Sequence, residues 1–185
     1  MNFLLIVSIF WVLSEIFLSR LMRANDSNND YDKSSLKILW ITICLSIILG
    51  IILRNPNFVL TPQYASFIYH IGISLICIGL IVRWMAILKL KKSFTVNVSV
   101  AANQTIVHSG IYKHIRHPSY LGSLLSFCGL GIVFNNWLTF IIIFIPIFSS
   151  FLYRIHIEEK LLSQVFGTQY RNYIKNSWKL IPKII

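Results

Sequence analysis

Two adjacent acidic residues are the most conspicuous candidates for chemistry in this chain. After Asp32 the only carboxylates are Glu158 and Glu159, although the same stretch is rich in lysine and arginine. Arg154 precedes Glu158 by one helical turn, so the two side chains share a face if this segment is helical. A solvated ion pair at a helix end explains this arrangement in one way. A functional site explains it in another, because ionisable groups bordering a long apolar run are functional candidates.

A second polar group lies in the run Gly110–Gly122, which reads GIYKHIRHPSYLG. Pro118 disfavours a helical conformation at His117 and suits the first turn of a new helix. The sequence therefore predicts Arg116, His117 and Tyr120 at a helix N-terminus, where free N–H groups favour a ligand carboxylate. An anchor of aromatic and basic residues at a membrane surface would have the same composition. The residues alone leave both interpretations open.

Several common kinds of active site are missing from the sequence. It contains no GxGxxG, Walker, HExxH or GxSxG pattern. No CxxC motif or Cys/His cluster indicates a metal site, and the three cysteines are widely spaced within apolar runs, which argues against a disulfide framework. Any nucleotide-like cofactor must therefore be held by something other than a soluble α/β domain.

The elements that position these residues are apolar. Hydrophobic residues make up 56% of the 185 positions and charged residues only 12%, about half the charged fraction of a soluble domain. Asn135 and Asn136 alone separate the last two apolar runs, so these two must form an antiparallel hairpin. The sequence thus predicts an all-α polytopic membrane helix bundle with about five spans. The apolar runs cover residues 2–18, 36–53, 64–88, 120–134 and 137–153.

The basic residues indicate the orientation of the bundle. The net charge is +11, and 15 of the 17 Lys and Arg residues lie in segments 20–37, 89–116 and 154–183. Five spans place these segments on one side, so the positive-inside rule predicts an outside N-terminus and a cytosolic active site. For a bacterial protein the membrane would be the plasma membrane. Contact with anionic lipid headgroups explains the charge better than nucleic-acid binding does, since no basic face is interleaved with exposed aromatics.

Small residues mark one face of the fourth apolar run. Gly122, Ser126 and Gly129 follow one another at nearly helical spacing. Close packing against a neighbouring helix is the favoured explanation. A cleft that lets a ligand approach the backbone would need the same residues.

Taken together, the motifs of the second half of the chain resemble one known family. GIYKHIRHPSYLG is followed by the hairpin, by Arg154 with the Glu158–Glu159 pair, by FGTQYRNY and by WKLIP. In order and spacing these blocks are similar to the membrane-embedded isoprenylcysteine carboxyl methyltransferases and the related phospholipid methyltransferases. The resemblance covers about residues 93–182. It divides the chain into N-terminal transmembrane helices, residues 1–90, and a catalytic core, residues 91–185, whose hairpin and cytosolic tail enclose a cofactor site.

The resemblance implies S-adenosylmethionine as the cofactor and assigns residues to it. Glu158 corresponds to the acid that holds the cofactor's amino group, and Arg154 corresponds to the arginine on the substrate side. A carboxylate acceptor needs no base, whereas a hydroxyl acceptor needs one, for which His117 and Glu159 are available. The remaining implied cofactor contacts are Asn97, Gln104, Thr105, Ile106, Val107, Tyr112, His117, Pro118, Ser119 and Tyr120.

The resemblance therefore predicts an S-adenosylmethionine-dependent O-methyltransferase in the membrane. Its acceptor would be the carboxylate or hydroxyl oxygen of a lipophilic molecule or a prenylated cysteine that arrives from the bilayer. One alternative is an NADPH-dependent reductase of the membrane sterol type, which has a related C-terminal architecture. The other is a non-catalytic multispan membrane protein. Binding of S-adenosylmethionine or of NADPH distinguishes the three.

Overall fold

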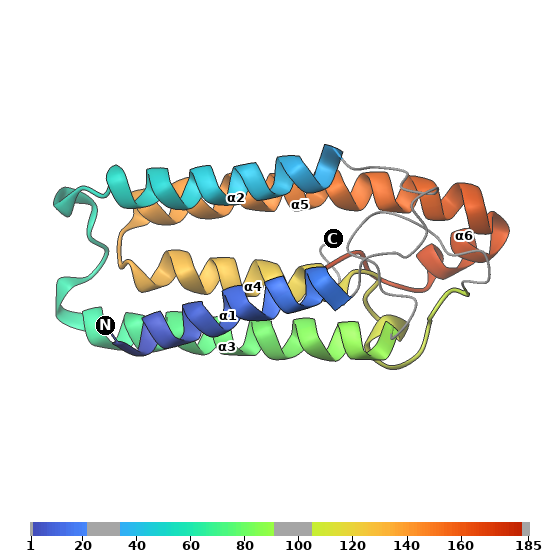
Figure 1. Ribbon diagram of the computed structural model, residues 1–185, viewed down its shortest axis with the longest axis horizontal. Helices are drawn as coiled ribbons and strands as arrows, with labels where there is room; N and C mark the ends of the chain where they lie inside the picture. The colour runs from blue at the N-terminus through green and yellow to red at the C-terminus, as the bar shows by residue number, and fades with distance from the viewer. Residues whose placement is uncertain (1, 22–33, 91–104, 183–185) are drawn as a thin grey trace.

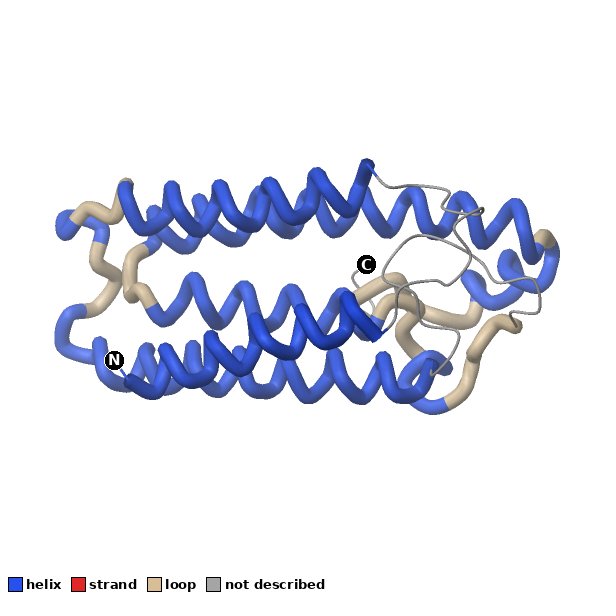
Figure 2. The backbone as a smooth tube through the Cα atoms, in the orientation of Figure 1, coloured by secondary structure: helices blue, strands red, loops and turns tan. Residues whose placement is uncertain are grey.

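A computed structural model describes residues 2–21, 34–90 and 105–182 of the chain. These residues contain no β-strand, and each predicted apolar run lies in a long helix, which confirms the all-α prediction (Figures 1 and 2). Short 3₁₀ helices connect them: η1 (Pro56–Phe58), η2 (Pro62–Tyr64) and η4 (Gly110–Lys113). The α-helices are α1 (Asn2–Leu21), α2 (Ser34–Ile52), α3 (Ala65–Leu90), α4 (Pro118–Val133), α5 (Trp137–Phe166) and α6 (Thr168–Lys175).

Three segments are long and apolar enough to cross a membrane: Ser34–Ile52, Pro62–Leu90 and Trp137–Phe166. Phe3–Leu18 and Pro118–Val133 are shorter apolar helices. All five run along the same axis, with α3 beside α4, α2 beside α5, and α1 lying across the α3–α4 pair (Figure 1). Many of their large apolar side chains, such as Phe10, Ile52 and Phe67, are exposed. A bilayer would cover such side chains, as expected for a membrane bundle.

Glycines allow α3 and α4 to pack with their backbones in contact. A Cβ atom at Gly122 would lie 2.6 Å from both the backbone N of Arg83 and the carbonyl O of Gly79, and one at Gly129 would lie 2.5 Å from the carbonyl O of Gly72. The Ser126 hydroxyl donates to the Ile76 carbonyl across the same interface, at 3.2 Å. The small residues of α4 therefore serve close helix packing, as predicted.

The α4–α5 hairpin turns on two asparagines. Asn135 has a positive φ of 47°, which asparagine tolerates better than most residues. The Asn136 side chain accepts a hydrogen bond from the Thr139 amide at 3.0 Å and so caps α5. The same side chain donates to the Asn55 carbonyl at 2.7 Å. This end of the hairpin is thereby fixed to the loop that joins α2 and α3.

The described parts of the basic segments lie at the opposite end of the bundle. The C-terminal ends of α1, α3 and α5 and the N-terminal ends of α2 and α4 all lie there (Figure 1). Helix α5 continues well beyond the apolar run at 137–153 and ends at Gly167, whose φ of 52° favours glycine. Helix α6 then turns back toward the bundle (Figure 2). This end therefore collects residues from both halves of the predicted site.

Candidate functional site

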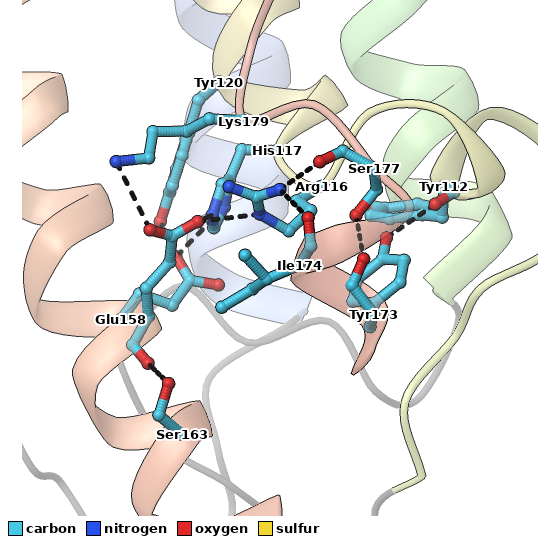
Figure 3. Close-up of polar contacts among 11 residues, drawn as sticks. Tyr112, Arg116, His117, Tyr120, Glu158, Ser163, Tyr173, Ile174, Ser177 and Lys179 are labelled. Carbon is cyan, nitrogen blue, oxygen red and sulfur yellow. Dashed lines mark hydrogen bonds and ion pairs between the residues drawn. The ribbon is translucent and has the colours of Figure 1, made fainter. Parts of the chain in front are cut away.

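The first turn of α4 and the polar end of α5 lie against each other at the basic end of the bundle. His117 occupies the N-cap of α4 and Pro118 its first turn, as predicted. Four residues from these two segments, His117, Tyr120, Glu158 and Glu159, form one connected group with the C-terminal residues around Lys179 (Figure 3). Residues of α4 and α5 that are 38 or more positions apart in sequence therefore build a common site.

Glu159 is held by three basic side chains. Its Oε1 lies 2.9 Å from Nε of Arg116 and 3.3 Å from Nε2 of His117, and its Oε2 lies 3.4 Å from Nζ of Lys179. A carboxylate only accepts hydrogen bonds, so Nε2 of His117 carries the hydrogen in this contact. These contacts hold the Glu159 carboxylate in place within the protein.

Glu158 has a different environment. Its Oε2 accepts a hydrogen bond of 2.7 Å from the Tyr120 hydroxyl and lies 3.9 Å from Nδ1 of His117. The rings of His117 and Tyr120 stack with centroids 5.6 Å apart. The side chain of Glu158 is 30% exposed, twice the 15% of Glu159. Of the two adjacent carboxylates, Glu158 is the one that can receive a cation from outside the protein.

Arg154 lies buried next to this pair, with only 2% of the residue exposed. Its Nε donates to the Tyr120 hydroxyl at 3.1 Å, and its Nη1 donates to the Ser35 hydroxyl of α2 at 2.9 Å. Tyr120 thus links Arg154 to Glu158, since its hydroxyl accepts from one and donates to the other. The sequence predicted Arg154 and Glu158 on one helix face and Tyr120 at the site, but not that the Tyr120 hydroxyl links the two.

A C-terminal strap, residues 176–180, closes over the start of α4. The Arg116 amide donates to the Trp178 carbonyl and the Trp178 amide donates to the His114 carbonyl, both at 2.8 Å. The His117 amide donates to the Lys179 carbonyl at 3.2 Å, and the Arg116 guanidinium donates to the Ser177 carbonyl. The strap leaves only 4% of the His117 side chain exposed. This explains why WKLIP belongs to the pattern: it pairs with the RHPSY segment.

Two tyrosines connect α6 to α3 through η4. The Tyr173 hydroxyl donates to the Tyr112 carbonyl at 2.6 Å, and the buried Tyr112 hydroxyl donates to the Ala86 carbonyl at 3.4 Å. Burial raises the pKa of Tyr173 to about 12, despite the nearby Arg116 guanidinium. Burial, together with the charge of Glu158, also raises the pKa of Tyr112. Both phenols therefore remain neutral donors at physiological pH.

The other predicted cofactor contacts have varied locations. Asn97 and Gln104 lie outside the described residues. Thr105, Ile106 and Val107 precede η4 in an irregular segment, where Thr105 is exposed and the other two are half-buried. No contact among the described residues joins these three to the glutamates, so their assignment stays a prediction.

Ser119 shares a turn with His117 but faces another neighbour. Its hydroxyl accepts a hydrogen bond of 3.1 Å from Arg83 of α3. Arg83 also binds Glu15 of α1 through two hydrogen bonds, of 2.6 and 2.7 Å. No local pattern predicted the pairing of Glu15 with Arg83, which are 68 residues apart. Within the described part of the chain, no group of three or more His, Cys, Asp or Glu side chains is placed to hold a metal ion.

Curated proteins of one kind are similar to this chain. Protein-S-isoprenylcysteine O-methyltransferase A of Arabidopsis thaliana is 28% identical over 142 residues, which cover 75% of this chain and 72% of that protein. The B protein of the same plant is 33% identical over 117 residues, covering 62% and 59% respectively. The Schizosaccharomyces pombe protein-S-isoprenylcysteine O-methyltransferase is 29% identical over 138 residues, covering 71% and 56%.

A solved structure has a similar fold. It is the eukaryotic intramembrane Ras methyltransferase ICMT, with a TM-score of 0.60 and 26% identity. The likeness covers 83% of this chain but 54% of that one, so this chain spans about half the length of the solved protein. The sequence pattern of the isoprenylcysteine carboxyl methyltransferase (ICMT) family matches residues 70–164, slightly more than half of the chain. The chain is therefore an integral membrane helix bundle that belongs to the isoprenylcysteine carboxyl methyltransferase family.

Proposed function

We propose that this protein transfers a methyl group from S-adenosylmethionine to an oxygen atom of a lipophilic acceptor. One observation carries the proposal: the two adjacent glutamates have unequal surroundings. Three basic groups hold Glu159, whereas Glu158 has a partly exposed carboxylate next to a neutral phenol. S-adenosylmethionine carries an ammonium group, which the partly exposed carboxylate of Glu158 could bind through a charge-assisted hydrogen bond.

The surroundings of Glu158 fit the other charged groups of this cofactor. The first turn of α4 offers backbone N–H groups without helical partners, which favour the cofactor's carboxylate. The ring of Tyr120 lies within reach of Glu158, and an aromatic face attracts a sulfonium or an ammonium cation. When bound, S-adenosylmethionine supplies the methyl group. The residues of this chain hold and orient the reactants and exclude water.

The contacts of Glu159 favour a carboxylate acceptor over a hydroxyl acceptor. A hydroxyl group must lose its proton, and a carboxylate that already binds Arg116, His117 and Lys179 is a weak base. An acceptor carboxylate is ionised at neutral pH and needs no base. It needs a positive charge to orient it, and Arg154 supplies one next to Tyr120. Because Arg154 is buried, the acceptor carboxylate would replace one of its present contacts.

The named activity of the relatives agrees with a carboxylate acceptor. They are protein-S-isoprenylcysteine O-methyltransferases, and we propose a prenylated cysteine, or a lipid with a similar terminal carboxylate, as the acceptor of this chain. Such a molecule would arrive from the bilayer. The basic end of the bundle would face the cytosol, with the N-terminus outside, because basic residues favour the cytosolic side. In this proposal residues 91–185 form the catalytic core, and residues 1–90 support it.

Isothermal titration of the detergent-solubilised protein with S-adenosylmethionine and with NADPH tests the proposal. We expect S-adenosylmethionine to bind and NADPH not to bind. Preferential binding of NADPH would favour the reductase alternative, and binding of neither would favour a non-catalytic protein. The substitution Glu158→Gln should weaken S-adenosylmethionine binding at least about tenfold, because it removes a charge-assisted contact. Lys160→Ala, which changes an exposed charge on the same helix, is the matched control and should leave the affinity unchanged.

Arg154 and Glu158 should be separable by their effects. Arg154→Ala should mainly slow turnover, since the guanidinium is assigned to the acceptor side. Glu158→Gln should mainly raise the dissociation constant for the cofactor. If the Glu158 variant binds S-adenosylmethionine as tightly as the unaltered protein does, the assignment of Glu158 is wrong.

A further inference from the structure

A second charged group lies inside the bundle, separate from the two glutamates. Glu15 of α1 and Arg83 of α3 form a two-pronged ion pair, with Nε to Oε1 at 2.6 Å and Nη2 to Oε2 at 2.7 Å. Their side chains are 16% and 13% exposed. Charges in an apolar bundle are costly to bury, so such a pair is retained only with good geometry or for a function.

The third nitrogen of Arg83 connects the pair to the start of α4. Nη1 donates to the Ser119 hydroxyl at 3.1 Å and to the Ser123 hydroxyl at 2.8 Å. Ser119 and Ser123 are both buried. The guanidinium therefore uses one edge to bind α1 and its remaining nitrogen to bind the first two turns of α4. Since the planar guanidinium moves as a unit, fixing one edge fixes the other.

The turn of α4 that Arg83 binds also carries two residues of the candidate site. His117 and Tyr120, which contact Glu159 and Glu158, are within three residues of Ser119. Gly122 leaves no space between this part of α4 and Arg83, since a Cβ atom there would lie 2.6 Å from the backbone N of Arg83. A shift of α4 relative to α3 would therefore move His117 and Tyr120 relative to α5.

We propose that Glu15 and Arg83 are positioning residues for the first turn of α4, and that α1 is required for the geometry of the site. Glu15 holds the Arg83 guanidinium in the orientation that places Ser119 and Ser123. Through that turn it sets the position of His117 and Tyr120 opposite the glutamates of α5. The link to cofactor binding rests on the proposed function, whereas the fixing of the α4 turn does not. This gives α1, which lies outside the matched family region at residues 70–164, a defined role.

Two measurements on matched variants test this role. Glu15→Gln keeps the shape of the side chain but removes its charge. Ser123→Ala removes one hydrogen bond of Arg83 and leaves the ion pair intact. The control is Thr139→Val, which removes a buried interhelical hydrogen bond of 3.0 Å to the Gly50 carbonyl at the other end of the bundle. Hydrogen exchange of the backbone amides of residues 117 and 119–123 and the dissociation constant of S-adenosylmethionine are measured for each variant.

Glu15→Gln should speed amide exchange at residues 117–123 and raise the dissociation constant about tenfold, and Ser123→Ala should do so about threefold, in line with the loss of a charged and a neutral partner. Thr139→Val should lower the thermal midpoint without either effect. The inference is refuted if Glu15→Gln changes exchange in the α4 turn and cofactor affinity no more than Thr139→Val does at an equal loss of stability. Faster exchange at 117–123 in a protein that binds no S-adenosylmethionine would support the positioning role and refute the proposed function.

Discussion

The hydroxyl oxygen of Tyr120 joins the two residues assigned to cofactor and acceptor. It donates to Glu158 at 2.7 Å and accepts from Arg154 at 3.1 Å. Tyr120→Phe removes this atom and keeps the ring that stacks on His117. The substitution therefore tests the link between Arg154 and Glu158 without opening a cavity in the site.

The size of the effect follows from the two contacts that are lost. A hydrogen bond to a charged group contributes about 1.5–3 kcal/mol when its partner is buried. Arg154 is 2% exposed but retains its contact with Ser35, and the side chain of Glu158 is 30% exposed, so water replaces part of its loss. We therefore expect a total of about 1.5–2 kcal/mol, which sets the upper limit of the effect on binding. A dissociation constant for S-adenosylmethionine about ten- to thirtyfold higher follows if the whole contribution serves to orient Glu158.

Isothermal titration of the solubilised variants measures this change directly. Tyr153→Phe is the control, because it removes the hydroxyl of an exposed tyrosine adjacent to Arg154 on α5. Its affinity should match that of the unaltered protein. An affinity of the Tyr120 variant within about twofold of the control would mean that the phenol does not orient Glu158 for the cofactor.

Further substitutions separate the parts of the site. Glu159→Gln should destabilise the strap by about 2 kcal/mol, since it leaves three basic groups without their carboxylate, and limited proteolysis should cut near the C-terminus faster. Lys179→Ala should cost less than about 1 kcal/mol in the same assay, because Lys179 is a third exposed. Gly122→Ala should lower stability by about 3 kcal/mol or more, because its Cβ would meet the backbone of α3. The control Gly167→Ala should leave the α3–α4 interface intact. Equal thermal midpoints for the Gly122 variant and the unaltered protein would contradict the close packing of α3 on α4.

The apolar runs predicted the helices well, because a run of apolar side chains marks where a helix lies in the bilayer. They did not predict where α5 ends. Its apolar run stops at residue 153, but the helix continues to Phe166, since helical hydrogen bonding does not depend on the polarity of the side chains. Gly167, with its positive φ, is the residue that ends it.

The site was predictable where neighbours in sequence carry it. Pro118 predicted the start of α4, and the scarcity of acids indicated Glu158 and Glu159 as functional candidates. The long-range contacts were not predictable. Glu15 lies inside an apolar run and its partner Arg83 inside another, and the strap meets residues 114–117 mainly through backbone hydrogen bonds. Such pairings depend on how helices stack, which a local pattern does not encode.

Methyl transfer to a defined acceptor is the most direct test of the proposed function. Membranes containing the protein are incubated with S-adenosylmethionine labelled in its methyl group and with a farnesylated cysteine derivative that has a free carboxylate. We expect label in the organic extract that alkali releases as methanol, as a methyl ester requires. With the cofactor kept below its dissociation constant for the unaltered protein, Glu158→Gln should give about a tenth of this label or less, because it weakens cofactor binding. A protein that binds S-adenosylmethionine but gives no alkali-labile label, or equal labelling by the Glu158 variant, would contradict the account.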